Sequence, residues 1–244
     1  MSKNAEICAN WIRNSKSIVA LTGAGISTSV GIPDFRGPNG IYVTKRYDPM
    51  ETFDINNFYK NPKPFFDFTR DLLSLSMNAH PSFAHYFLNK LENMGKLKAI
   101  ITQNVDMLHQ KAGNKSVFEI HGSYMFSKCL KCGKVFNFDQ FSKMVFNMEV
   151  PLCDKCGGLI KPDIVFFGEP IKFLKESLLK ISNSELLLVI GTSLKIYPAS
   201  MLPYYAKKVI AVSKGDVSVP NEKVILRVDS DIDEFFKEVD SLLK

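Results

Sequence analysis

The sequence lacks the apolar run of roughly 18 residues that a membrane-spanning helix needs. Its first six residues, MSKNAE, have none of the apolar core of a signal peptide. Lysine and arginine do not gather in a block, so the net charge of +6 predicts a solvated basic surface that permits acidic partners without indicating nucleic acid. Internal repeats and low-complexity tracts are also absent. We therefore expect a cytoplasmic protein with no membrane partner.

What the chain does have is enough apolar material for a large core. It contains 244 residues, of which 45% are hydrophobic. This length predicts one large domain, or one domain that carries a small insert.

Short apolar runs alternate with amphipathic stretches. Residues 17–22, 97–102, 186–190 and 208–212 are apolar at successive positions, as strands buried on both faces are. Helical patterns lie between or after them, for example at 83–91 and 231–243. Strands separated by helices predict an α/β fold with a doubly wound parallel sheet. Two stretches interrupt the alternation, at residues 35–78 and 125–162.

Four of the five cysteines form two pairs with a spacing of two residues. Cys129 and Cys132 make the first pair, and Cys153 and Cys156 make the second. Two such turns can complete a tetrahedral shell of four thiolates around zinc, which we favour over disulfides or an iron–sulfur cluster. A closed shell predicts a structural ion. Cys8 is left over, and its helical pattern predicts a buried small hydrophobe.

A glycine-rich turn follows the first predicted strand. Residues 23–28 read GAGIST, and glycine there lets backbone approach a pyrophosphate at a helix start. The third glycine of the usual dinucleotide fingerprint is missing, so a plain tight turn is an equal alternative from these residues alone. The motif GIPDFR at 31–36 follows, and its plain interpretation is a core Phe35 with Arg36 paired to Asp34.

The second predicted strand ends in a polar motif. Residues 103–106 read QNVD and stand at the carboxyl edge of the sheet, where ligands of open α/β folds bind. Helix capping is the alternative for its Asn and Asp. His121 ends the next short strand, at 117–120, and is placed for proton transfer. The other histidines, at 80, 85 and 109, lie in helical patterns that favour surface or core packing.

Taken together and in this order, the motifs GAGIST, GIPDFR, QNVD and HG with the cysteine pairs resemble the sirtuins, NAD-dependent protein-lysine deacylases, of the short bacterial and archaeal type. The resemblance implies a Rossmann-like lobe at about 1–34, 79–124 and 163–244, and a small lobe of cofactor loop with helices at 35–78 and zinc ribbon at 125–162. It implies that His121 and Asn104 are catalytic, with Phe35 excluding water from the reacting carbon. The implied NAD-binding residues are Gly23, Ala24, Gly25, Thr28, Phe35, Arg36, Gln103, Asn104, Val105, Asp106, His121, Gly191, Thr192, Ser193, Ser213 and Ile232.

The resemblance further implies transfer of an acyl group from lysine to ADP-ribose with release of nicotinamide. Acylated-lysine proteins or peptides would be the partners, binding by strand addition at Val165, Phe167, Gly168 and Glu169. NAD and one structural zinc ion would be the cofactors. Two alternatives are a mono-ADP-ribosyltransferase that uses the same NAD site, and a non-enzymatic binding module on a decayed nucleotide fold.

The chain departs from the sirtuin pattern at the adenosine end. Ser213 and Lys214 stand where sirtuins place an Asn after the strand, and the glycine usual near the last strand is absent around residues 228–231. The Tyr-x-x-Arg pair of succinyl-preferring sirtuins is also absent between Phe35 and Asn78. We therefore predict a preference for uncharged acyl groups, which Arg70 would overturn if it reached the pocket.

Overall fold

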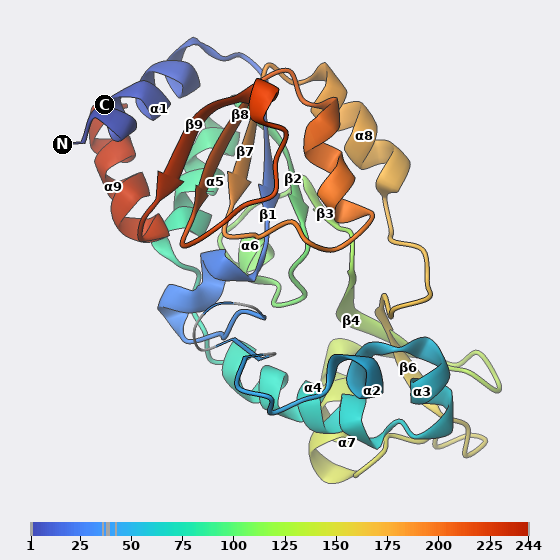
Figure 1. The fold of residues 1–244 in the computed structure, drawn as a ribbon. Coiled ribbons are helices and arrows are strands. Elements are labelled where there is room, and N and C mark those ends of the chain that lie inside the picture. The colour runs from blue at the N-terminus through green and yellow to red at the C-terminus, as the bar shows by residue number, and fades with distance from the viewer. Residues whose placement is uncertain (1, 36, 38–39, 42, 244) are drawn as a thin grey trace.

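The computed structural model describes residues 2–35, 37, 40–41 and 43–243. Figure 1 shows two parts, an upper one built on a parallel sheet and a lower one of helices and short strands. In chain order the elements are α1 (Lys3–Asn14), β1 (Ile18–Thr22), η1 (Ala24–Val30), α2 (Pro49–Phe53), α3 (Ile55–Lys60), α4 (Lys63–Ser76), α5 (Phe83–Asn93), β2 (Leu97–Thr102), α6 (Leu108–Lys111), β3 (Val117–Glu119), β4 (Gly122–Cys129), β5 (Val135–Asn137), α7 (Phe138–Asn147), β6 (Ile160–Ile164), α8 (Leu174–Asn183), β7 (Leu186–Ile190), η2 (Ala199–Tyr205), β8 (Val209–Ser213), η3 (Asn221–Lys223), β9 (Val224–Asp229) and α9 (Ile232–Leu242).

Within the described residues, the upper part contains a six-stranded sheet in the order β3-β2-β1-β7-β8-β9. Every neighbouring pair in it is parallel. The chain builds outward from β1 in both directions, first through β2 to β3 and later through β7 to β9. This order confirms the predicted doubly wound sheet and puts its topological switch point between β1 and β7.

The central strands are buried on both faces, as their unbroken apolar runs predict. Ala20 of β1 faces the core beneath α1, α5 and α9, whereas Val19 and Leu21 face the core beneath α8 and η2. The helices form by ordinary amphipathic and capping rules. Helix α1, for example, buries Ala5, Cys8, Ala9 and Ile12 along one stripe, and Ser2 caps its first turn.

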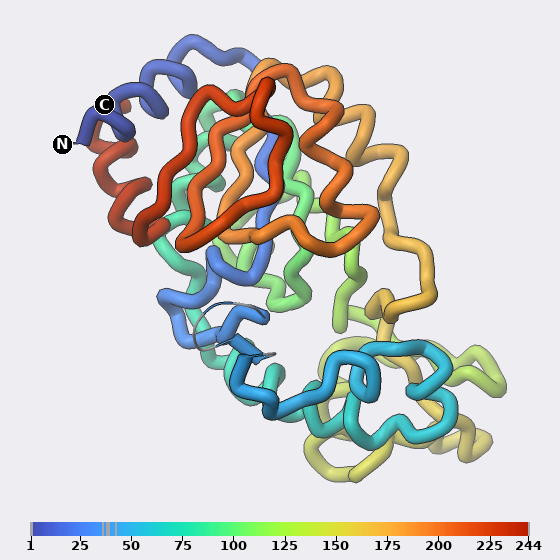
Figure 2. Tube along the Cα trace, in the orientation of Figure 1, coloured from blue at the N-terminus to red at the C-terminus, as the bar shows by residue number. Residues whose placement is uncertain are grey.

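The lower part has its own core, rich in phenylalanine. A three-stranded antiparallel sheet in the order β5-β4-β6 packs with α4 and α7. Its cluster of buried residues includes Phe58, Phe65, Phe66, Phe141 and Phe166. Figure 2 shows the chain leaving the upper part and returning to it, so segments distant in sequence build this lower part together.

Cys8 is fully buried, and burial raises the pKa of its thiol to about 12. This confirms its predicted use as a small core hydrophobe. No helix among residues 2–35 and 43–243 is both long and apolar enough to cross a bilayer.

Two buried histidines pack against each other beneath the switch point. The rings of His85 and His109 have their centroids 4.6 Å apart, and both are essentially inaccessible. His85 Nδ1 accepts the Ser82 backbone N–H, and His109 Nε2 hydrogen-bonds to the Thr22 hydroxyl at 2.9 Å. Burial lowers the pKa of His85 from 6.5 to about 4 and also lowers the pKa of His109, so both imidazoles are neutral in the fold.

These pKa shifts predict a protein that loses stability on mild acidification. Because the folded-state pKa of His85 lies below its unfolded value, its contribution is complete above about pH 6.5 and falls as the pH drops towards 4. The loss should approach about 3 kcal/mol for this group. Urea unfolding between pH 7.5 and 4.5 measures it. His85→Gln, which keeps an acceptor for the Ser82 N–H, should weaken the pH dependence, and an unchanged pH slope would contradict this assignment.

Candidate functional site

Two glycine turns meet at the switch point. The Gly25 N–H donates to the Gly191 carbonyl at 2.8 Å, which joins the turn after β1 to the turn after β7. A Cβ built on Gly25 would lie 2.8 Å from the Gly191 Cα, and one on Gly23 would lie 2.6 Å from the Thr192 Cβ. The close packing of the two turns therefore requires glycine at positions 23 and 25, whether or not a ligand also approaches them. The helix expected after such a turn is present as the 3₁₀ helix η1 at residues 24–30.

Asn104 and Asp106 lie directly beneath these turns and are almost fully buried. Asp106 Oδ2 accepts the Ser27 hydroxyl at 2.7 Å, and Asp106 Oδ1 accepts the Leu108 backbone N–H at 3.0 Å. Asn104 Nδ2 donates to the Gly23 carbonyl at 3.2 Å and to Asp106 Oδ2 at 3.3 Å. Asp106 thus accepts the first N–H of α6, although Met107 holds the N-cap position of that helix without a side-chain cap, and it also belongs to a buried polar network at the strand ends.

Ser27 is a member of this network that sequence reasoning missed. Its hydroxyl is fully buried and links η1 to Asp106. The sequence places Ser27 within the glycine-rich motif, but only the fold shows that its side chain points towards the QNVD segment. Thr22 and His109 form a second such link, between the end of β1 and α6.

Gln103 and His121 connect the remaining strand ends. Gln103 Nε2 donates to the Thr192 hydroxyl at 2.9 Å, across the switch point. His121 Nδ1 lies 3.0 Å from the Gln103 carbonyl oxygen, and a carbonyl can only accept, so Nδ1 carries the proton. The lone pair is therefore on Nε2. Burial lowers the pKa of His121, and the hydrogen bond to Gln103 opposes that shift, so the ring is neutral near pH 7.

The GIPDFR segment follows η1 and runs towards the lower part. The Phe35 ring packs edge-on against Phe53 with centroids 6.1 Å apart, and it lies at the border of the phenylalanine-rich core. Asp34 Oδ1 accepts the Gly37 N–H at 2.9 Å, which closes a turn. The predicted NAD contact at Arg36 lies outside the described residues.

The predicted substrate segment begins where β6 ends. The strand stops at Ile164, so residues 165–167 lie beyond it. The Val165 N–H donates to the His121 carbonyl at 2.8 Å, which brings the segment beside the predicted base. Phe167 pairs through both backbone groups with Phe53 and Ile55, so part of the edge expected for strand addition is already used.

The predicted adenosine contacts lie at the far strands. Ser213 ends β8 and is buried, with its hydroxyl 3.4 Å from the Lys214 carbonyl. Ile232 begins α9, and its side chain belongs to the core beneath that helix. A contact between Ile232 and a ligand would therefore use its backbone. Thr28 is exposed, and its hydroxyl donates to the Gly25 carbonyl at 3.0 Å.

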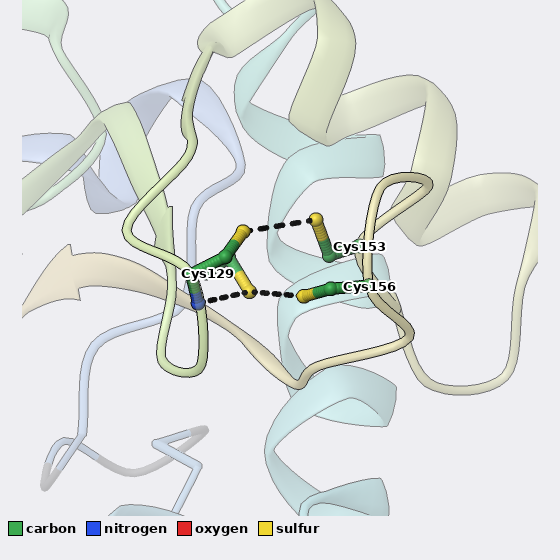
Figure 3. A group of neighbouring side chains, drawn as sticks. Cys129, Cys153 and Cys156 are labelled. Atoms are coloured by element: carbon green, nitrogen blue, oxygen red, sulfur yellow. Dashed lines mark hydrogen bonds between the residues drawn. The ribbon is translucent and has the colours of Figure 1, made fainter.

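The four paired cysteines converge in the lower part, as the spacing predicts. Figure 3 shows Cys129, Cys153 and Cys156 facing one another across two loops. All four sulfur atoms lie within 4.8 Å of one another, with Cys129 to Cys156 at 3.5 Å and Cys132 to Cys153 at 3.7 Å. Zinc–sulfur bonds of about 2.3 Å in a tetrahedron require sulfur separations of about 3.8 Å. The residues therefore fit a closed structural zinc site.

The glycines beside these cysteines form the expected tight turns. Gly133 has φ of 73° and donates its N–H to the Cys129 carbonyl, and Gly157 has φ of 67° and donates to the Cys153 carbonyl. A Cβ on Gly158 would lie 2.8 Å from the Cys129 sulfur. Any larger residue at these positions would strain the turns that aim the sulfurs at one point.

Comparison with known proteins gives a consistent result. The Sir2 family model matches residues 23–198. An NAD-dependent protein deacetylase 1 from Pyrobaculum aerophilum is 48% identical over 82% of this chain and 78% of its own length. An NAD-dependent protein deacetylase from Thermotoga maritima is 42% identical over 93% of this chain and 94% of its own. A solved Sir2 structure with a deacetylated p53 peptide and 3'-O-acetyl ADP-ribose superimposes with a TM-score of 0.90, at 40% identity over 98% of both chains. The chain therefore belongs to the Sir2 family.

Proposed function

We propose that this protein is an NAD-dependent protein-lysine deacylase that moves the acyl group from lysine to ADP-ribose. The observation that carries the proposal is the environment of His121. Its Nδ1–H is fixed on the Gln103 carbonyl, its Nε2 is a free base, and its carbonyl holds the segment that begins with Val165. A base thus lies between the polar network at the strand ends and the predicted acyl-lysine segment.

The residues at the switch point fit NAD. Bound NAD would supply the ADP-ribosyl group that receives the acyl group, with nicotinamide as the leaving group. Asn104 and Asp106 present a buried donor and acceptor that suit a ribose hydroxyl and the nicotinamide carboxamide. The turns at Gly23–Gly25 and Gly191–Ser193 present backbone at the carboxyl edge, where a pyrophosphate binds in open α/β folds. The remaining predicted contacts, Ala24, Thr28, Gln103, Val105, Ser213 and Ile232, complete the proposed cradle.

His121 is the proposed general base. Its Nε2 takes a proton from a ribose hydroxyl, and the Gln103 carbonyl stabilises the imidazolium that forms. Because its pKa is lowered, the ring is in the basic form before the reaction. Phe35 is proposed to keep water from the reacting carbon, since water at that carbon would give simple NAD hydrolysis.

The mono-ADP-ribosyltransferase alternative would use the same NAD residues with another nucleophile. No observation favours it, and the related proteins above carry deacetylase names. One experiment separates the two activities. The purified protein is incubated with an acetyl-lysine peptide, with and without NAD, and the products are analysed by mass spectrometry. Loss of acetyl from the peptide only when NAD is present supports the deacylase, whereas ADP-ribose attached to peptide or protein without deacetylation would contradict it.

The small zinc site has no open coordination position in this proposal, so its role is structural. Cysteine ligands that remain reduced suit a cytoplasmic location, which we propose on that ground. We also propose the lobe boundaries expected from the sequence, with the Rossmann-like lobe at about 1–34, 79–124 and 163–244 and the small lobe at about 35–78 and 125–162.

Acyl preference can be argued from two cations near α4. Arg70 donates to Asp67, to the Val145 carbonyl and to the carbonyls of Met148 and Glu149, so all three of its guanidinium nitrogens are engaged near the end of α7. Lys111 donates to carbonyls at the end of α4 and just beyond it. A mostly apolar cavity of ≈ 150 Å³ lies against Asp106 and has Lys111 in its lining, but the predicted acyl-lysine residues Val165 and Phe167 do not line it.

We therefore expect acetyl-lysine to be a good substrate, longer uncharged chains to be accepted, and succinyl-lysine to be poor. Each methylene that is buried contributes about 0.8 kcal/mol, whereas an unpaired buried carboxylate costs several kcal/mol. The measurement compares kcat/KM for one peptide with acetyl, butyryl, myristoyl and succinyl groups. Succinyl equal to acetyl would show that one of these cations is available to the substrate.

A further inference from the structure

The segment at residues 164–169 lies beside His121 but is neither helix nor strand beyond Ile164. Its only bridge, within the described part of the chain, is the single pairing of Phe167 with Asp54. Backbone hydrogen bonds hold Val165 and Phe167, and side-chain contacts hold Ile164 and Phe166. Those contacts converge on one cation, the ammonium of Lys161.

Lys161 lies on β6 and bends back over the segment that follows. Its Nζ donates to the Ile164 carbonyl at 2.8 Å and lies 3.0 Å from Glu169 Oε2. The same ammonium stands 4.6 Å from the centre of the Phe166 ring, within range of a cation–π contact. One group therefore contacts the start, the middle and the end of the segment.

Glu169 closes the arrangement from the other end. Its Oε2 accepts the Phe166 backbone N–H at 2.9 Å, and its own N–H donates to the Phe166 carbonyl at 3.0 Å. Its carboxylate is thus directed into the turn and not towards a ligand. This places the predicted substrate contact at Glu169 on its backbone, together with Gly168, whose φ of 96° makes the turn possible.

Phe166 anchors the same turn in the lower core. It is 2% exposed, and its ring lies 4.7 Å from Phe65 and 4.8 Å from Phe58, centroid to centroid. Because Phe166 points into the core, its neighbours Val165 and Phe167 are directed to other sides and remain only partly buried. The ammonium lies over this anchoring ring, between the two partly buried side chains in sequence.

Burying the charged ammonium of Lys161 costs desolvation free energy. Its side chain is 12% exposed, and desolvation is the main cause of its lowered pKa, which Glu169 partly opposes. Burial of a cation is tolerated only when its partners satisfy it. Here the partners belong to a single conformation of the segment, so the cation favours that conformation over others.

We infer that Lys161 is a positioning residue for acyl-lysine peptides, because its ammonium holds residues 164–169 in the geometry that presents Val165 and Phe167 beside His121. This inference rests on the proposed function and specifies which residue shapes its peptide site. It assigns no part in NAD binding to Lys161.

The test uses Lys161→Met in the full-length zinc-loaded protein, with peptide and NAD varied separately. The expected result is a KM for the acetyl-lysine peptide raised about tenfold or more, because a displaced binding segment weakens productive binding. The KM for NAD should stay within about twofold of the wild-type value. Lys172→Met is the matched control. The Lys172 ammonium pairs with Asp163, which lies on β6 as Lys161 does. Removing the Lys172 ammonium should therefore change both KM values by about twofold at most.

Two further variants separate positioning from simple support of the fold. Lys161→Arg keeps the charge and should recover most of the peptide KM. Glu169→Gln keeps an acceptor for the Phe166 N–H but removes the ion pair, and should raise the peptide KM less than Lys161→Met does. If Lys161→Met is too unstable to assay, the Lys161→Arg and Glu169→Gln pair still tests the inference. A peptide KM unchanged in Glu169→Gln and unrestored in Lys161→Arg would overturn it.

Equal losses in kcat, in both KM values and in the melting temperature would also overturn the inference, because they indicate a structural role alone. Failure of this inference is distinct from failure of the proposed function. A wild-type protein that shows no NAD-dependent deacetylation disproves the function, whereas an active wild type with an unaffected Lys161→Met variant disproves only the positioning role.

Discussion

Replacing His121 by alanine is expected to abolish deacylation while the protein still folds and binds NAD. The substitution removes the Nε2 base and the Nδ1–H donation to Gln103, but it leaves the backbone that holds Val165. A general base typically contributes ~10² to 10⁴ in rate, so kcat should fall by at least about 100-fold. Steady-state deacetylation and NAD binding by calorimetry measure the two quantities on the same preparation.

His80→Ala is the matched control, because His80 is exposed and lies outside the strand-end network. It should retain wild-type turnover. Deacetylation by His121→Ala within about tenfold of wild type would show that another group removes the proton.

Replacing Cys129 by serine, or removing zinc with a strong chelator, is expected to abolish activity although the metal takes no part in the chemistry. The four sulfurs lie within 4.8 Å of one another, and two glycine turns with positive φ hold them there. The binding of a structural zinc ion is worth about 10–16 kcal/mol, which is as large as the stability of a typical domain. Loss of the ion should therefore unfold the lower part, including the core in which Phe166 is anchored.

Metal content, thermal unfolding and turnover measure this effect together. Cys8→Ala is the control, because Cys8 lies in the core beneath α1 and should keep one zinc ion per chain. If the chelated protein kept both its thermal transition and its turnover, the cysteine cluster would not be a structural zinc site.

Much of the fold could be predicted because a strand that is buried on both faces has an unbroken run of apolar residues in the sequence. The strands β1, β7 and β8 lie where unbroken apolar runs predict them, since each is covered by helices on both faces. The end of β6 could not be predicted, because the apolar run through residues 164–167 continues past it. There the chain leaves its strand and turns, and Lys161 pairs with Glu169 across that turn, a contact between side chains that no periodicity encodes.

The candidate site likewise has residues that the sequence could predict and side-chain contacts that it could not. The sequence placed Asn104, Asp106 and His121 at strand ends, and parallel strands bring such ends to one edge. It could not show that the Ser27 hydroxyl bonds Asp106, because that pairing depends on how η1 packs over the QNVD segment. Nor could it show that the Ile232 side chain faces the core, since the helical pattern that begins there leaves its orientation open.

The location of the acyl group after a single turnover tests the central claim most directly. Stoichiometric enzyme, acetyl-lysine peptide and NAD are mixed, and the products are quantified by mass spectrometry. The proposed function predicts equal amounts of free lysine peptide, nicotinamide and acetyl-ADP-ribose, with none of them formed by His121→Ala at a comparable rate. Free acetate that forms without nicotinamide release, or ADP-ribose attached to protein while the peptide keeps its acetyl group, would contradict it.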